Sequence, residues 1–98
     1  MAYSVRLDPR AVEDIRETID YYEEQEPELG KRFKQELDRH ILLLEENPFY
    51  QVRYDNVRCL PVKIFPHMLH FTIDHEQKQV TVWAVFHTSM DPQKWGKR

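Results

Sequence analysis

The sequence has little of several features that larger folds and common active sites need. Its 98 residues include one cysteine and two glycines. A single cysteine excludes an internal disulfide, and two glycines exclude a glycine-rich phosphate-binding loop. The chain is also too short for a doubly wound dinucleotide-binding domain. We therefore expect one small domain over residues 1–98, with room for one core and one site.

Long apolar runs are also missing. The longest, Ile41–Leu44 and Val82–Phe86, are far shorter than the roughly 20 residues that a membrane-spanning helix needs. The first residues have neither the basic stretch nor the apolar stretch of a signal peptide. Together with the lone cysteine, these features predict a cytoplasmic protein that does not contact a membrane.

The sequence offers few ligands for a structural metal and no common enzyme motif. One cysteine and five histidines scattered from His40 to His87 make the four ligands of a structural zinc site hard to assemble. The patterns Gly-x-Ser-x-Gly and His-Glu-x-x-His are absent, so we expect no metal and no cofactor. Cys59 could be a nucleophile only beside a histidine base, and a packed strand side chain is the favoured interpretation.

Charge is distributed unevenly, although the net charge is only −3. Residues 1–50 have a net charge of −6 and residues 51–98 one of +3, and the second half holds four of the five histidines. An anionic partner responds to the local field rather than to the total. The pattern fits a binding face in the second half, and it fits equally well an acidic solvated helix pair beside an ordinary sheet.

Two amphipathic helices are predicted in the first half of the chain. Asp8-Pro9 starts the first, because Asp is a favoured N-cap and proline is tolerated at the first helical position. Pro27 restarts the helical pattern, and Asn47-Pro48 ends it. The short break predicts a helical hairpin with both apolar stripes facing the same way. These stripes are Val12, Ile15, Ile19 and Tyr22, then Leu29, Phe33, Leu37, Ile41 and Leu44.

Strands are predicted on both sides of this hairpin. Residues 3–7 alternate as a short strand, and residues 56–65, 68–73 and 80–87 form three more after the helices. Pro61 removes one ladder donor, which favours an edge position for its strand. The predicted fold class is therefore α+β, with an N-terminal strand, a helical hairpin and a three-stranded antiparallel meander packed on the helices.

The period of two divides the last two strands into faces. The face opposite the helices is predicted to be less apolar, and it carries two histidines and Trp83, so we expect function there. The residues predicted to pack against the helices are Leu69, Phe71 and Ile73 of one strand, and Val80, Val82, Ala84 and Phe86 of the other.

Two segments of the second half carry a specific pattern. Arg58 is followed by a Phe-Pro turn, and Val85–Trp95 reads His-x-x-x-x-Pro-x-x-Trp. On these residues, and on the helices with Asp14 and Tyr21-Tyr22, the whole chain resembles the RelE/ParE toxin superfamily. These are the toxin halves of bacterial type II toxin–antitoxin, or plasmid stabilisation, systems. The resemblance implies the α+β fold described above and a tightly bound antitoxin whose C-terminal segment wraps the toxin.

The resemblance implies two activities. RelE-like members cleave messenger RNA in the ribosomal A site, whereas ParE-like members inhibit DNA gyrase and have no established hydrolytic site. We favour ribosome-dependent mRNA cleavage, which would inhibit translation, by a small margin. The alternatives are a non-enzymatic gyrase inhibitor and a catalytically inactive binding module whose only partner is the antitoxin.

A metal-free ribonuclease needs a base, an acid and cations that stabilise the developing phosphorane charge. His87 is the first candidate, because it lies at a strand end and matches a family position that is often functional. The candidate catalytic residues are His87 and His70 for proton transfer and Arg58 and Lys63 for charge stabilisation. The candidate substrate-binding residues are Arg53, His67, Trp83 and Trp95, where His67 could also transfer a proton and the tryptophans could stack on bases.

One position departs from the family pattern. Members often carry arginine three residues after this histidine, whereas this chain has Met90. A thioether cannot donate a hydrogen bond to a phosphate, and losing one well-placed donor typically costs about 10²–10³ in rate. Met90 therefore weakens the nuclease hypothesis, unless this side chain simply packs beneath the tail.

Overall fold

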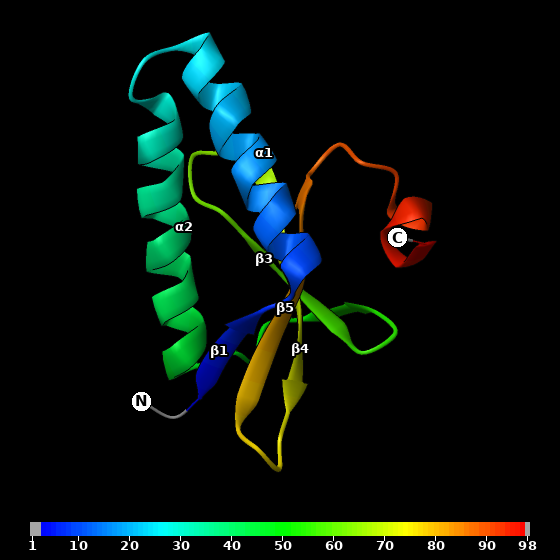
Figure 1. Cartoon of the computed structure of the whole chain (residues 1–98). Helices are drawn as coiled ribbons and strands as arrows, with labels where there is room; N and C mark the ends of the chain where they lie inside the picture. The colour runs from blue at the N-terminus through cyan, green and yellow to red at the C-terminus, as the bar shows by residue number, and fades with distance from the viewer. Residues whose placement is uncertain (1–2, 98) are drawn as a thin grey trace.

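The computed structural model describes residues 3–97, and it has the predicted α+β architecture. The helical hairpin packs on one face of a sheet (Figure 1). The chain ends in a short 3₁₀ helix, which follows the last strand. Between residues 3 and 97, no helix is long and apolar enough to cross a membrane. The elements are β1 (Ser4–Leu7), α1 (Pro9–Gln25), α2 (Leu29–Glu46), β2 (Val52–Tyr54), β3 (Val57–Pro61), β4 (His67–Asp74), β5 (Gln79–His87) and η1 (Pro92–Lys97).

The sheet has five strands in the order β1-β5-β4-β3-β2. The antiparallel meander β3-β4-β5 is confirmed, and β1 adds to it in parallel with β5. Strand β2 was not predicted, because it is three residues long and largely exposed. The edge position predicted for the strand with Pro61 is wrong, since β3 lies between β4 and β2. Pro61 lies beyond the residues that β2 pairs with, so the missing N–H costs no bond there.

The two helices begin as their sequences indicate, but through different contacts. The Asp8 carboxylate accepts the backbone N–H of Arg10 at 3.0 Å, and mainly this bond lowers the pKa of Asp8. Helix α2 has no such N-cap of its own. Instead, the Glu23 carboxylate of α1 accepts the backbone N–H of Gly30 at 2.9 Å. A Cβ on Gly30 would lie 2.5 Å from the Ile19 carbonyl oxygen, so only glycine lets the helices approach this closely.

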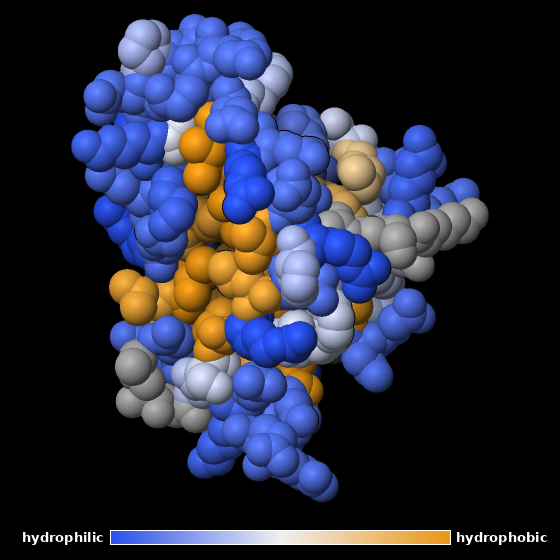
Figure 2. Space-filling model, viewed as in Figure 1, coloured by the Kyte–Doolittle hydropathy of each residue, from blue (hydrophilic) through white to orange (hydrophobic). Residues whose placement is uncertain are grey.

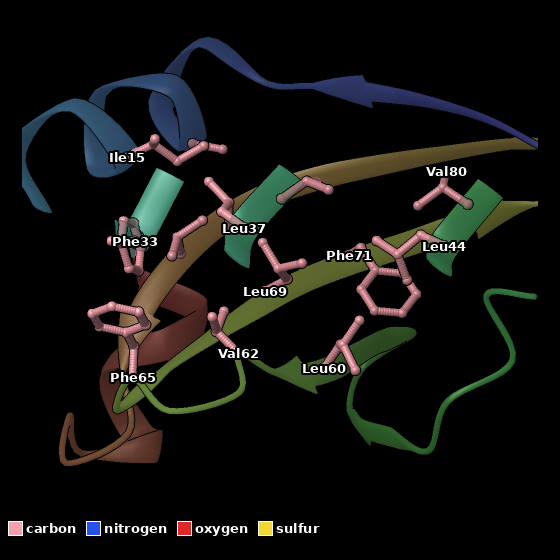
Figure 3. Packing of buried hydrophobic residues seen from close by; sticks show 13 residues of the cluster. Ile15, Phe33, Leu37, Leu44, Leu60, Val62, Phe65, Leu69, Phe71 and Val80 are labelled. Atoms are coloured by element: carbon pink, nitrogen blue, oxygen red, sulfur yellow. The ribbon is translucent and has the colours of Figure 1, made fainter. Parts of the chain in front are cut away.

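The main core lies between the helical hairpin and the sheet (Figure 3). Both predicted helical stripes contribute to it, with Phe33, Leu37 and Leu44 from α2 almost fully buried. The aromatic rings at one end pack edge to face, as for Phe33 and Phe65 at 5.2 Å between centroids. The prediction that the stripes face the sheet together is confirmed except at Val12, which is 37% exposed and outside this core.

The β5 strand changes face at a bulge. Val82 lies opposite Phe71 and Ala84 lies opposite His70, so no β4 residue lies opposite Trp83 in the register. This extra residue inverts the alternation of the strand. As a result Val85 joins the core beneath the helices, whereas Ala84 and Phe86 belong to a second buried cluster. The prediction that Ala84 and Phe86 pack against the helices is wrong, because a one-residue shift reverses every following side chain.

The second cluster covers the sheet face that was expected to be open. It consists of Cys59, Met68, Ala84, Phe86 and Trp95, with Tyr54 and Met90 packed against it. Trp95 comes from η1 and is 8% exposed. Met90 therefore packs under the tail, as one of the two interpretations of this position expected.

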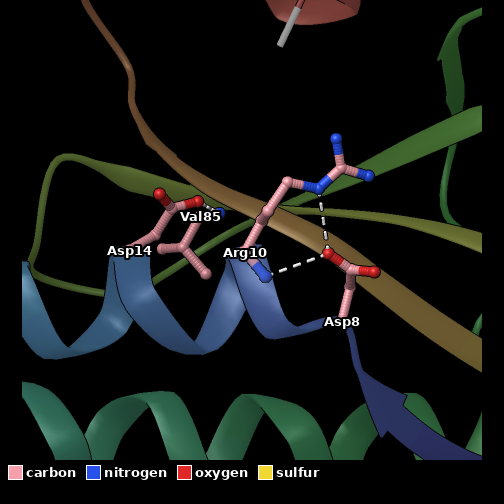
Figure 4. A network of polar contacts seen from close by, with 4 residues as sticks. All are labelled: Asp8, Arg10, Asp14 and Val85. Carbon is pink, nitrogen blue, oxygen red and sulfur yellow. Dashed lines mark hydrogen bonds and ion pairs between the residues drawn. The ribbon is translucent and has the colours of Figure 1, made fainter.

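Helix α1 is fixed to the bulged part of β5 by a polar contact (Figure 4). The Asp14 carboxylate accepts the backbone N–H of Val85 at 3.0 Å. At the N-cap of α1, the backbone N–H of Asp8 donates to the Val82 carbonyl at 2.9 Å, where the β1 ladder ends. Two backbone groups of β5, one at the end of the β1 ladder and one beyond it, are thus satisfied by Asp8 and Asp14.

Replacing Asp14 by alanine should leave the Val85 N–H without this acceptor. We expect Asp14→Ala to lower the free energy of unfolding by about 1.5–3 kcal/mol, the range for hydrogen bonds to charged groups. Urea unfolding measures the effect, and Asp20→Ala, an exposed change on the same helix, should cost less than about 0.5 kcal/mol. Equal losses in the two variants would contradict this role of Asp14.

Candidate functional site

The structure brings five of the eight candidate site residues into two groups and leaves the three cations outside them. His67 and His87 meet on the helix-facing side, at the end of the sheet. Trp83, Trp95 and His70 lie on the opposite side, in or beside the second cluster. None of the three cations Arg53, Arg58 and Lys63 is among the described residues that line the hollows beside these two groups.

His67 and His87 form a cross-strand pair. They lie directly opposite each other in the β4–β5 register, with ring centroids 5.1 Å apart. The Tyr22 hydroxyl lies 3.4 Å from Nδ1 of His67. An open hollow of about 510 Å³ adjoins the pair. This histidine hollow is lined by Glu17, Thr18, Tyr21, Tyr22, Pro66, His67 and His87.

The contacts of His87 fix where its proton resides. The backbone N–H of Ser89 donates to Nδ1 of His87 at 3.0 Å, and the Ser89 hydroxyl lies 2.7 Å from the same nitrogen. A nitrogen that accepts a backbone N–H has no proton of its own, so neutral His87 has its proton on Nε2. In this arrangement Nε2 is a donor. It can give a hydrogen bond to a ligand, but it cannot act as the base that takes a proton.

His67 is buried and neutral near physiological pH. Its side chain lies beneath Tyr22 and against Phe33, and the residue is 7% exposed. Burial, and to a smaller extent the neighbouring His87, lower the pKa of His67 to about 4. The pair therefore brings two imidazoles together without a positive charge on His67.

The α1 side of this hollow was not predicted from the sequence. Glu17, Thr18 and Tyr21 lie on α1, and the Tyr21 and Tyr22 rings contact each other edge to face at 5.4 Å. Tyr21 and Tyr22 were part of the family resemblance, but the sequence did not predict that they lie over the end of the sheet. Among the described residues that line the hollow, Glu17 is the only carboxylate, and none is lysine or arginine.

On the opposite side, His70 is fully enclosed. Its Nδ1 lies 3.0 Å from the Tyr54 hydroxyl and 3.5 Å from Sγ of Cys59, and the Trp95 ring covers it at 4.9 Å. Cys59 thus has a histidine neighbour, but burial raises the pKa of its thiol to about 11. A protonated, buried thiol is a packed side chain rather than a nucleophile.

The two tryptophans contribute to one shallow hollow of about 240 Å³. Trp83 is partly buried at the bulge, and its Nε1–H donates to the Thr72 hydroxyl at 2.8 Å. Trp95 stacks obliquely on Tyr54 at 5.3 Å between centroids. This tryptophan hollow is lined by Arg10, Tyr54, Asp55, Val57, Trp83, Ala84 and Trp95.

The candidate cations are not part of the histidine hollow, whose described lining has no lysine or arginine. Arg58 donates to the Tyr50 carbonyl at 2.8 Å and lies over the Phe49 ring. It pairs with Phe71, four residues from His67 along β4, which is about 13 Å at 3.3 Å per residue. Arg53 is exposed on β2, and Lys63 is exposed on the loop after β3. In residues 3–97, no group of three or more His, Cys, Asp or Glu side chains could hold a metal ion.

A match to a protein-family model tests the resemblance to the RelE/ParE toxins. The model described as "ParE toxin of type II toxin-antitoxin system, parDE" matches residues 5–92. The chain belongs to the ParE toxin family of type II toxin–antitoxin systems. The family assignment makes the chain a toxin of this class, and the RelE/ParE resemblance is confirmed. No curated protein matches the sequence significantly.

Solved structures of ParE and RelE toxins share the fold of this ParE-family chain. The chromosomal ParDE system from P. aeruginosa aligns with 16% identity over 90% of this chain and 98% of the other, with a TM-score of 0.79. The intact E. coli RelBE complex aligns with 19% identity over 88% and 96%, with a TM-score of 0.67. The archaeal RelE–RelB complex from Pyrococcus horikoshii gives 10% identity over 93% and 100%, with a TM-score of 0.63.

The lowered pKa of His67 predicts a pH dependence of stability. Between its ordinary value of 6.5 and the folded value of about 4, the unfolded chain binds more protons than the folded toxin. The free energy of unfolding should therefore be fully retained above pH 6.5 and fall toward pH 4, by at most about 1.4 kcal/mol per pH unit.

Urea unfolding at several pH values between 7 and 4 measures this slope. The carboxylates also titrate in this range, so the comparison is between the wild-type chain and His67→Gln, which should have a shallower slope. His75→Gln, on the exposed β4–β5 loop, serves as the control and should keep the wild-type slope. An unchanged slope in His67→Gln would show that His67 is not held neutral by the fold.

Proposed function

We propose that this ParE-family toxin inhibits DNA gyrase by binding to it and does not cleave RNA. This is the non-enzymatic alternative that the resemblance left open, and it now replaces ribosome-dependent cleavage as the favoured activity. The single observation that carries the proposal is the lining of the histidine hollow, which has two imidazoles and a carboxylate but no lysine or arginine among its described residues.

RNA cleavage makes specific demands on such a hollow. The scissile phosphate and its phosphorane transition state are anionic, and metal-free catalysis needs donors with positive charge beside them. Here the charged lining residue is Glu17, which repels phosphate. Arg58 is directed to the Tyr50 carbonyl at 2.8 Å, and it lies about 13 Å along the sheet from the histidines.

The protonation states of the imidazoles also oppose cleavage. Nδ1 of His87 accepts the Ser89 N–H, so Nε2 of neutral His87 has no lone pair to accept the 2′-hydroxyl proton. His67 could accept a proton, but burial keeps its pKa near 4, about three units below the operating pH. His70 is enclosed under Trp95, and Met90 packs against the same cluster.

The proposal includes a cognate antitoxin. The P. aeruginosa ParDE and E. coli RelBE structures are toxin–antitoxin systems, and this chain has their fold. An uncovered apolar band crosses the helical side of the molecule between hydrophilic margins (Figure 2). On α1, Val12, Ile15 and Ile19 contribute to a shallow hollow there. Exposed apolar surface of this kind suits a protein partner.

Two assays in parallel test the activity. Gyrase-catalysed DNA supercoiling and cleavage of end-labelled mRNA on programmed ribosomes are measured with wild-type toxin, His87→Ala and Met90→Arg. We expect all three chains to inhibit supercoiling and none to cleave mRNA, because the proposed inhibition uses no proton transfer. His75→Ala, an exposed histidine outside the hollow, is the matched control.

Cleavage of mRNA that depends on His87 would instead support nuclease activity. Cleavage by the wild-type chain that falls by about 10²-fold or more in His87→Ala, and rises in Met90→Arg, would show that His87 transfers a proton and that a missing cation limits the rate. Loss of supercoiling inhibition without any cleavage in His87→Ala would keep the toxin non-enzymatic and place His87 at the gyrase contact.

A further inference from the structure

Ile64 has a strained backbone and an exposed side chain. It lies in the loop between β3 and β4, with a φ of 79° and 73% of its surface exposed. Positive φ is unfavourable for β-branched residues, and such outliers persist only where the surroundings impose them. The other described non-glycine residues with positive φ are polar, namely Glu28, Asp55 and Lys78. An exposed isoleucine in this conformation has no packing role that would explain it.

The residues on both sides of Ile64 are anchored, and this imposes the strain. His40 of α2 is buried, and its Nδ1 lies 2.7 Å from the Glu36 carbonyl, which makes Nδ1 a donor. Its Nε2 therefore accepts the backbone N–H of Lys63 at 3.1 Å. On the other side, the Phe65 ring is buried against Phe33. The loop is thus fixed at two points, and Ile64 is held outward between them.

Positive charge surrounds this exposed side chain. A hollow of about 240 Å³ separates the loop from α2, with Arg32, Gln35, Glu36 and Arg39 along α2. The Glu36 carboxylate is 10% exposed and accepts Nη1 of Arg39 at 3.1 Å. Lys63 is exposed beside Ile64. Arg32, Arg39, Lys63 and Ile64 form what we call the Ile64 patch, which has an excess of positive charge on a chain of net charge −3.

We propose that the Ile64 patch is the surface by which the toxin docks on its cellular target, and that it fits an acidic protein surface with an apolar socket for Ile64. This inference rests on the proposed function, because a toxin that acts by binding needs a built contact surface rather than a reactive group. Carboxylates on the target complement Arg32, Arg39 and Lys63. A nucleic acid needs only the cations, whereas a rigidly presented aliphatic side chain suits a protein pocket.

Substitution by glycine separates stability from function at this position. Ile64→Gly removes the side chain and the backbone strain together, so we expect the Tm to rise by about 4–8 °C while growth arrest on induced expression weakens about tenfold or more. Lys78→Gly is the matched control, because it also replaces a positive-φ residue, at the opposite end of β4. It should not weaken growth arrest. Lys63→Glu should weaken growth arrest without raising the Tm.

Binding measurements distinguish the target from other partners. The same variants are titrated with the co-expressed cognate antitoxin, and we expect wild-type affinity for it in Ile64→Gly. Growth arrest equal to wild type in Ile64→Gly would overturn the proposal. So would a lower Tm in both Ile64→Gly and Ile64→Asn, because asparagine tolerates positive φ. A loss confined to antitoxin affinity, or to binding of a DNA duplex, would assign the patch to that partner instead.

Growth arrest can be measured whether or not gyrase is the target. The gyrase proposal and the docking-surface proposal can therefore fail separately. If wild-type toxin leaves gyrase supercoiling unaffected but Ile64→Gly still loses growth arrest, the gyrase assignment fails and the docking surface stands. If wild-type toxin inhibits supercoiling and Ile64→Gly inhibits it equally, the gyrase assignment stands and the docking surface fails.

Discussion

The bulge of β5 at Trp83 is the constraint on which the two-sided structure depends. Because one extra residue enters β5 opposite β4, the strand places Val85 beneath the helices, and Ala84 and Phe86 beneath the tail. The Asp14 carboxylate accepts the Val85 N–H, which ties this irregular segment to α1. A domain of 98 residues thereby buries both faces of its central strands. As a consequence, little of the sheet surface remains open for a reactive site.

Much of the fold followed from local patterns. Apolar stripes of period 3.6, an Asp-Pro start and an Asn-Pro stop gave both helices within a few residues, since these signals act within one element. The bulge carries no comparable signal. Val82–Phe86 is an apolar run in which either alternation is plausible, and the shift arises from pairing with β4 and from the contact with Asp14. The parallel addition of β1 is likewise a tertiary outcome.

For the candidate site, the sequence indicated residue types but not their arrangement. His67 and His87 were named, and the β4–β5 register brings them together. Tyr22 and Glu17 were missed, because only the packing of α1 over the sheet end places them there. The cations were chosen from their residue type, but Arg58 is held by the Tyr50 carbonyl and Lys63 lies on the loop after β3. These basic residues, which are close together in the sequence, thus lie in different elements of the fold.

The tautomer of His87 tests the non-enzymatic account most directly. Long-range ¹⁵N–¹H correlation spectra of the imidazole at pH 7.5 report which ring nitrogen is protonated, and Ser89→Pro, which lacks the backbone N–H, provides the reference state. The account predicts a proton on Nε2 and an unprotonated Nδ1 that accepts the Ser89 N–H. A neutral ring with its proton on Nδ1 and a free lone pair on Nε2 would contradict it, because His87 could then serve as a catalytic base.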